Sequence, residues 1–239
     1  MFLYPFFQFL KLRSALRKLN PTSGQKNTAI ILGDLGSGKK WLSLDVVSDY
    51  DVLKSMNFKI LWLDCSLCIT LREDYNALKK LMIKINPQYP ELDDNSINEN
   101  TLPNMILRLK EHIKIILESK EYRNCLLVLA NVHNVKCQEA FNLGCKRLII
   151  TRNKKVSESL STKLNIHVTL DEGLQLKEFH LLLDKYITTY NWRTDNSDLA
   201  NDIYYMSNGD PYMLSTIARN LIERKSNWHE WLTNLNNFQ

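Results

Sequence analysis

The sequence of 239 residues lacks an apolar run long enough to cross a bilayer, which takes roughly 20 residues. Its apolar start, residues 1–10, is far shorter and has neither a basic leader nor a small-residue cleavage site. We expect this stretch to pack on the domain or to mark the edge of a longer protein. We therefore expect a cytoplasmic protein with no membrane partner.

A dense basic stripe is also missing. The chain carries 31 Lys and Arg against 26 Asp and Glu, for a net charge of +5. The basic residues form short groups, such as Lys146, Arg147 and Arg152, rather than a continuous face. This pattern is typical of solvated faces and one phosphate site, so we expect no nucleic-acid partner.

Cysteines are few and odd in number, which argues against a disulfide framework. There are five, and Cys125 lies inside an apolar run, as expected of reduced thiols. Cys65 and Cys68 form a CxxC pair, but no second pair follows at zinc-ribbon spacing. His133 and Cys137 would complete a site only by chance of folding. We therefore interpret these cysteines as small apolar residues near a strand end and expect no metal ligands.

Short apolar runs alternate with helical patterns along most of the chain. The strand-like runs cover residues 28–33, 58–64, 125–129, 146–151 and 166–170, with clear helical patterns at 71–85 and 102–117. This alternation predicts a five-stranded parallel sheet with helices on both faces, the three-layer α/β/α fold of P-loop NTPases.

Only helical patterns follow residue 171, at 176–188, 198–206, 211–223 and 227–235. Asp210 is a predicted N-cap, with Pro211 in the first turn. These patterns predict a small helical bundle. The predicted organisation is an N-terminal segment and helix at 1–20, a P-loop α/β domain at 21–172 and a helical domain at 173–239.

The strongest motif is G-x-x-x-x-G-K, between an apolar strand and a helical pattern. Its glycines let successive backbone N–H groups face one cluster of oxygens, and the new helix directs its positive end to the same place. We predict phosphate binding by the residues Gly33, Asp34, Leu35, Gly36, Ser37, Gly38, Lys39, Lys40 and Trp41.

Two segments depart from an active P-loop NTPase. The residue after the motif lysine is normally Ser or Thr, which holds Mg²⁺, but here it is Lys40. The apolar run at 125–129 normally ends in acidic residues, but here Ala130 and Asn131 follow it. We therefore expect doubtful Mg²⁺ binding and little hydrolysis, and we assign no catalytic residue.

Another strand-like run ends in Thr151 and Arg152. The carboxyl ends of parallel strands meet at one edge, so Arg152 is predicted beside the phosphate loop, where its guanidinium would contact the terminal phosphate. A surface arginine after a strand is the alternative.

Taken in order, these segments resemble the NB-ARC module of the apoptotic protease-activating factors and their insect relatives, within the STAND class of AAA+-like P-loop proteins. The matching segments are the phosphate loop at 33–39, Leu-Leu-Val-Leu-Ala-Asn-Val at 126–132, the strand and its Thr-Arg end at 144–156, Asn-Gly-Asp-Pro at 208–211 and Trp-His-Glu-Trp at 228–231. Together they span nearly the whole chain.

The resemblance implies a cofactor and a role. Loop amides would cradle ADP, ATP or dATP, Arg152 would be a sensor arginine, and Pro211 would pack on the adenine. The module would act as a nucleotide-dependent switch in caspase activation and apoptosis. Contacts with caspases and other apoptosome subunits would need domains missing here, and a homo-oligomer is possible. Two alternatives remain open: an active P-loop ATPase or kinase, with Asp34, Asp64 or His133 supplying a ligand or base, and an interaction scaffold that has lost nucleotide.

Overall fold

The computed structural model describes residues 6–20, 27–89, 99–160, 165–170, 173–187 and 197–223. The Trp-His-Glu-Trp segment and the helix predicted at 227–235 lie outside these residues. Among the described residues, no helix is both long and apolar enough to cross a membrane.

Five parallel strands form one sheet in the order β2-β3-β4-β1-β5. They are β1 (Thr28–Gly33), β2 (Ile60–Asp64), β3 (Leu126–Val132), β4 (Lys146–Thr151) and β5 (Ile166–Leu170). In β1, Ile30 pairs with Ile149 of β4 on one side and His167 of β5 on the other. Helices cover both faces, so the strands are apolar almost throughout, and the predicted fold class is confirmed.

The observed strand bounds differ from the predicted ones at two places. The second strand begins at Ile60 and not at Phe58, whose φ of 56° is left-handed and whose side chain is exposed. The third strand runs on to Val132, past the end of its apolar run, because Val132 pairs with Thr151 of β4 and Cys65 donates its amide to the carbonyl of Ala130 at 2.8 Å.

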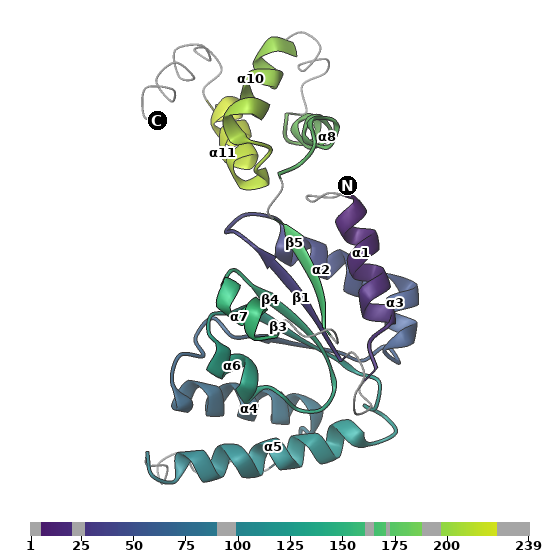
Figure 1. Ribbon diagram of the computed structural model, residues 1–239, viewed down its shortest axis with the longest axis vertical. Coiled ribbons are helices and arrows are strands. Elements are labelled where there is room, and N and C mark those ends of the chain that lie inside the picture. The colour runs from purple at the N-terminus through teal and green to yellow at the C-terminus, as the bar shows by residue number, and fades with distance from the viewer. Residues whose placement is uncertain are drawn as a thin grey trace.

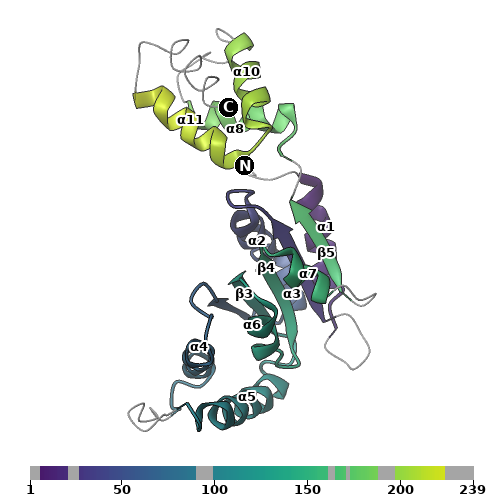
Figure 2. The same ribbon diagram turned by 60° about the vertical axis from the view of Figure 1, so that its left-hand side comes forward.

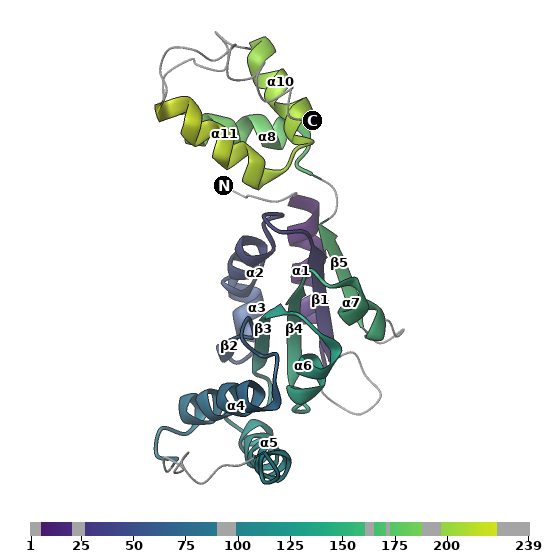
Figure 3. The same cartoon turned by 90° about the vertical axis from the view of Figure 1, so that its left-hand side faces the viewer.

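Two helical layers enclose the sheet (Figures 1 and 3). Helices α1 (Phe6–Arg17), α2 (Lys39–Val47) and α3 (Tyr50–Ser55) pack on one face around Leu16, Leu42 and Val128. The opposite face carries α4 (Leu71–Ile85), α5 (Leu102–Glu118), α6 (Val135–Ala140) and α7 (Lys154–Ser159). The sheet therefore separates two apolar cores, as a three-layer domain requires.

Two basic residues that the sequence suggested as solvated are buried instead. Lys146 and Arg147 start β4 and are 6% and 4% exposed. Lys146 Nζ donates to the carbonyl of Ser55 at 3.1 Å, and Arg147 donates to that of Gln138 at 3.3 Å. Each of these two charges thus donates to a backbone carbonyl at the amino edge of the sheet, although Arg147 Nε is buried without a partner among the described residues.

A separate helical bundle lies beyond the carboxyl edge of the sheet (Figures 1 and 2). It contains α8 (Leu176–Tyr186), α10 (Ser197–Ser207) and α11 (Pro211–Glu223), which share a core around Phe179, Ile203 and Leu214. The predicted cap of α11 is confirmed, since the Asp210 carboxylate accepts hydrogen bonds from the amides of Tyr212 at 2.7 Å and Met213 at 3.1 Å.

The chain entering the bundle touches the turn before α11 through backbone alone. The Leu174 amide donates to the Gly209 carbonyl at 2.8 Å. A Cβ on Gly173 would lie 2.1 Å from the Asn208 oxygen, and one on Gly209 would lie 2.4 Å from the Leu174 oxygen. Both glycines are therefore required for this close approach.

Candidate functional site

The predicted phosphate loop connects β1 to α2 at the carboxyl edge of the sheet. Gly36 and Gly38 have φ values of 82° and 83°, which fold the loop into a tight curl. Gly38 is the N-cap of α2 and has no side chain with which to cap it. The first amides of a helix have no partner within the helix, so this end of α2 offers N–H groups and positive potential to an anion.

Gly36 also touches the helical bundle. A Cβ at Gly36 would lie 2.4 Å from the Cβ of Tyr212, in the first turn of α11. Only glycine permits this approach, in addition to the left-handed φ. The tip of the phosphate loop and the start of α11 are therefore in direct contact.

Lys39 holds its ammonium against the loop. Its Nζ donates to the carbonyl oxygens of Gly33, at 2.6 Å, and Asp34, and to Ser37 Oγ at 3.2 Å. Burial lowers the pKa of Lys39, the nearby Asp34 acts in the opposite direction, and the charge of Arg152 lowers it further. Two like charges therefore converge here, an arrangement that a bound anion stabilises.

Two cavities that share Leu35, Lys39, Asn131 and Ile150 adjoin the loop. The first, of about 290 Å³, reaches the helical bundle; its other lining residues are Gly36, Gly38, Lys40, Trp41, Pro211, Tyr212 and Ser215. The second, of about 240 Å³, follows the sheet edge, and Val132, His133, Thr151 and Arg152 complete it. Arg152 and Pro211, far apart in sequence, thus line two different cavities that share Lys39.

Three predicted residues lie elsewhere on the loop. Asp34 and Ser37 line a neighbouring cavity of about 220 Å³ that extends toward Gly173 and Asn208. Gly33 lines none of the three cavities and instead supports the loop, with its carbonyl holding Lys39. A Cβ on Gly33 would meet Ser37 Oγ at 2.7 Å and the Leu170 oxygen at 2.9 Å.

The place where a P-loop NTPase holds its metal contains a neutral amide and an ammonium. Asn131 lies in an irregularity of the β3–β4 pairing with a left-handed φ of 58°, and its Nδ2 donates to Asp64 Oδ1 at 3.0 Å. Burial would raise the pKa of Asp64, but hydrogen bonds from Asn131 and Ser66, with the charge of Lys40, lower it. Magnesium prefers several oxygen ligands, and this set does not fit it.

Sequence reasoning missed Tyr212, Ser215, Ile150 and His133 as lining residues. Ile150 is a buried strand residue, and its pattern signals only a core position. Tyr212 and Ser215 follow Pro211 on α11, so the resemblance of the turn before that helix was the only available signal. His133 had been considered only as a metal ligand or base.

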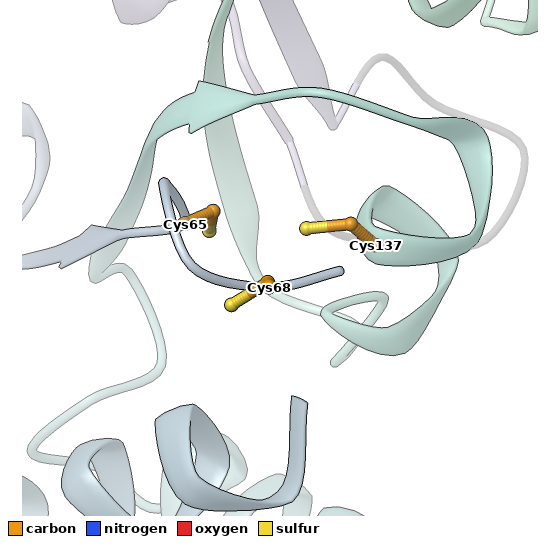
Figure 4. A group of neighbouring side chains, drawn as sticks. All are labelled: Cys65, Cys68 and Cys137. Atoms are coloured by element: carbon orange, nitrogen blue, oxygen red, sulfur yellow. The ribbon is translucent and has the colours of Figure 1, made fainter. Parts of the chain in front are cut away.

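The structure brings Cys137, which the sequence analysis places near the CxxC pair only by chance of folding, next to Cys65 and Cys68. The sulfur atoms of Cys65, Cys68 and Cys137 all lie within 4.8 Å of one another, below the sheet edge (Figure 4). Two separate segments supply them, so spacing in the sequence could not reveal the group.

No family model matches the chain. Over 231 residues, which are 96% of the chain, it is 25% identical to the human protein apoptotic protease-activating factor 1. The mouse protein of the same name is 24% identical over 224 residues, or 93% of the chain. The fold, the loop and these relatives agree. The chain is an NB-ARC-like P-loop module.

This NB-ARC-like module spans less than a fifth of the length of these relatives, 18% of the human protein and 17% of the mouse protein. Among solved structures, Cdc6p from Pyrobaculum aerophilum is similar, with a TM-score of 0.55 at 15% identity. That alignment covers 92% of the NB-ARC-like module and 62% of Cdc6p, so the shared fold includes most of the helical part.

Proposed function

We propose that the chain binds an adenine nucleotide, ADP or ATP/dATP, between the phosphate loop and the helical bundle. One observation carries the proposal: Lys39 stands between a cavity that Arg152 lines and a cavity that Pro211 lines. A nucleotide has anionic and aromatic ends, and this site offers the cations of Lys39, Lys40 and Arg152 together with the apolar and aromatic side chains beside Pro211.

The phosphates would lie on the backbone amides from Gly36 to Trp41, with Lys39 released from the loop carbonyls to meet them. Arg152 would reach the terminal phosphate from the sheet edge, where a guanidinium forms paired hydrogen bonds. The adenine would pack against Pro211, beside the exposed ring of Tyr212. Such rings bury well against a flat heterocycle.

Binding at this place supports a nucleotide-dependent switch. The cavity draws residues from both parts of the chain, so a ligand that fits it stabilises this arrangement over others. The similarity to apoptotic protease-activating factors supports an apoptosome-type scaffold role in caspase activation. In that role, caspase contacts and assembly of copies would use parts of a longer protein.

We further propose that the module hydrolyses nucleotide poorly. The ammonium of Lys40 repels a cation, Ala130 supplies no ligand, and Asn131 is a poor base. Phosphate release tests this point: turnover near 1 per second, ordinary for an enzyme, would favour the ATPase alternative, with Asp64 or His133 in a catalytic role.

Nucleotide extraction tests binding itself. The chain is purified natively and denatured, and the released small molecules are separated by chromatography. We expect close to one adenine nucleotide per chain, lost in Lys39→Ala and kept in Lys84→Ala, a matched change at an exposed position of α4. Absence of nucleotide, combined with no uptake of added ADP, would favour the empty scaffold and overturn the proposal.

A further inference from the structure

We propose that Cys65, Cys68 and Cys137 bind a thiophilic divalent metal ion, Zn²⁺ in the reduced cell, with the carboxylate of Asp74 as fourth ligand. The site is separate from the nucleotide cavity, and its metal would have a structural role. None of its ligands lines any of the three cavities around the phosphate loop.

The three sulfurs already have nearly the spacing that a metal needs. They lie within 4.8 Å of one another. Zinc binds thiolates at about 2.3 Å, so sulfurs around one tetrahedral zinc stand about 3.8 Å apart. A closure of at most about 1 Å therefore brings them to the ligand distance. In Figure 4 the Cys137 sulfur points from α6 toward the loop that carries Cys65 and Cys68.

Backbone hydrogen bonds fix the positions of all three cysteines. The Cys65 amide extends the sheet by donating to Ala130, and the Cys68 amide closes a tight turn onto the Cys65 carbonyl at 3.0 Å. The Cys137 amide donates at 2.7 Å to Oδ1 of Asn134, the N-cap of α6. A site held in this way loses little conformational freedom when the ion binds.

A buried carboxyl beside the sulfurs provides a second, independent observation. Asp74, on the first turn of α4, is only 6% exposed and lies within hydrogen-bonding reach of the Cys68 thiol. Its Oδ1 is buried and has no hydrogen-bond partner in the described part of the chain. A buried carboxylate oxygen without a partner is costly, and coordination to a cation removes that cost. The carboxylate is not among the ligand atoms that lie within 4.8 Å of one another, so the Asp74 side chain would shift toward the sulfurs to reach the ion.

The chemistry of these side chains suits zinc. Thiolates, not thiols, are metal ligands, and three of them with one carboxylate match the preference of zinc for sulfur in closed, four-ligand sites. A disulfide bond would join only two of the three thiols and leave the third free.

The metal would join α6 to the loop after β2 and to α4, the helix into which that loop leads. The loop after β2 supplies Cys65 and Cys68, α6 supplies Cys137, and α4 supplies Asp74. Asp64, which holds Asn131 at the nucleotide cavity, directly precedes Cys65. Metal binding would therefore also fix the end of β2 next to that cavity.

Cobalt titration tests the site on the full chain, reduced with a phosphine and freed of metal. One equivalent of Co²⁺ is expected to give the near-ultraviolet absorption of sulfur-to-cobalt charge transfer, and Zn²⁺ is expected to displace it. In Cys137→Ser the affinity should fall by more than about 100-fold, beyond the loss typical of an outer partner. Asp74→Asn should keep the charge-transfer absorption but bind Co²⁺ more weakly.

The other two cysteines provide a matched control. Cys125 and Cys145 are buried at the opposite end of the strands, so Cys125→Ser with Cys145→Ser leaves three cysteines and should leave cobalt binding unchanged. No charge-transfer absorption in the wild type, or equal absorption in Cys137→Ser, would overturn the proposal. So would an intact mass showing a Cys65–Cys68 disulfide in the freshly purified protein.

X-ray absorption at the zinc edge avoids dependence on variants that fold poorly. The zinc-loaded wild-type chain should show three sulfur neighbours and one oxygen neighbour. Any other set of neighbours would contradict the site. Nucleotide extraction is independent of these results, so failure of the metal site leaves the proposed nucleotide function standing, and the reverse also holds.

Discussion

Asn131 donates a hydrogen bond from Nδ2 to Oδ1 of Asp64 at 3.0 Å, so the ends of β3 and β2 are tied to each other where P-loop NTPases hold a metal. The amide takes up an oxygen that would otherwise be available to a cation. Lys40 adds a positive charge on the same side. The position resembles a neutralised metal site, with an ammonium and an amide in the place of an ion and its water.

The first prediction concerns magnesium. Because Lys39 and Lys40 supply positive charge that Mg²⁺ would otherwise provide, omitting Mg²⁺ should weaken ADP binding by less than about tenfold, or 1.4 kcal/mol. Titration calorimetry with and without Mg²⁺ measures this. A much larger loss would show that a metal ligand set exists after all.

The second prediction concerns Arg152. Its guanidinium lines the cavity beside Lys39, so Arg152→Ala should remove a charge-assisted contact and weaken nucleotide binding by about 1.5–3 kcal/mol, or roughly 10-fold to 150-fold. Arg123→Ala, at an exposed position before β3, is the matched control. Equal nucleotide affinity in Arg152→Ala and Arg123→Ala would show that Arg152 is a surface arginine that makes no contact with the nucleotide.

A third prediction compares two glycines with similar backbone. Gly36 and Gly144 have φ values of 82° and 79°, and a Cβ would meet Tyr212 at the first but open space at the second. Both changes to Ala should cost roughly 1–2 kcal/mol from the left-handed conformation. Only Gly36→Ala should also weaken ADP binding, by more than about tenfold or 1.4 kcal/mol. Urea unfolding and calorimetry separate the two effects, and retained affinity in Gly36→Ala would contradict the contact with α11.

A fourth prediction concerns the attachment of α1. Arg13 Nε lies 3.0 Å from Asp49 Oδ2, and Asp49 also caps α3. Burial would raise the pKa of Asp49, but hydrogen bonds from Arg13 and from the Val52 and Asp51 amides lower it below its ordinary 3.8. This contribution to stability is present above the unfolded pKa, about 3.9, and is lost as pH falls through the lower folded value.

Unfolding free energies measured by urea from about pH 5 down to about pH 3 test this. The wild type should lose stability steeply, and Asp49→Asn, which keeps a capping side chain, should show a shallower fall. Arg13→Ala should reproduce the shallower fall. A wild-type slope in Arg13→Ala would show that the ion pair does not cause the shift.

The sheet and its loop were predictable because buried parallel strands have a distinct sequence pattern. Runs such as 28–33 and 146–151 have a continuous apolar centre, although Lys146 and Arg147 begin the second run, and both match their strands at each end. The sequence places Phe58 in the strand because its side chain is apolar. Its left-handed backbone is required by the turn before the strand, and the residue type gives no indication of that conformation. The short helices α3, α6 and α7 have too few residues to show a period.

The site was predictable only where one segment carries it. The phosphate-loop motif predicts the position of Lys39, and the end of the fourth strand predicts that of Arg152. Both predictions follow because the carboxyl ends of parallel strands meet at one edge of the sheet. The position of Tyr212 in the site depends on how the helical bundle packs against that edge. No local sequence pattern predicts that packing. Cys137 meets Cys65 and Cys68 for a similar reason: α6 follows β3, the neighbour of β2, and that adjacency is a property of the sheet order.

The glycine contact between the two parts of the chain has a mechanical consequence. Gly33 abuts Leu170 at the end of β5, Gly173 and Leu174 abut Gly209, and Tyr212 abuts Gly36. Leu170, Gly173 and Leu174 among these residues line the cavity of about 220 Å³ beside the phosphate loop. A displacement at one of these contacts requires a displacement at another. A ligand in the cavity and a partner that binds the helical bundle would therefore each change the affinity for the other.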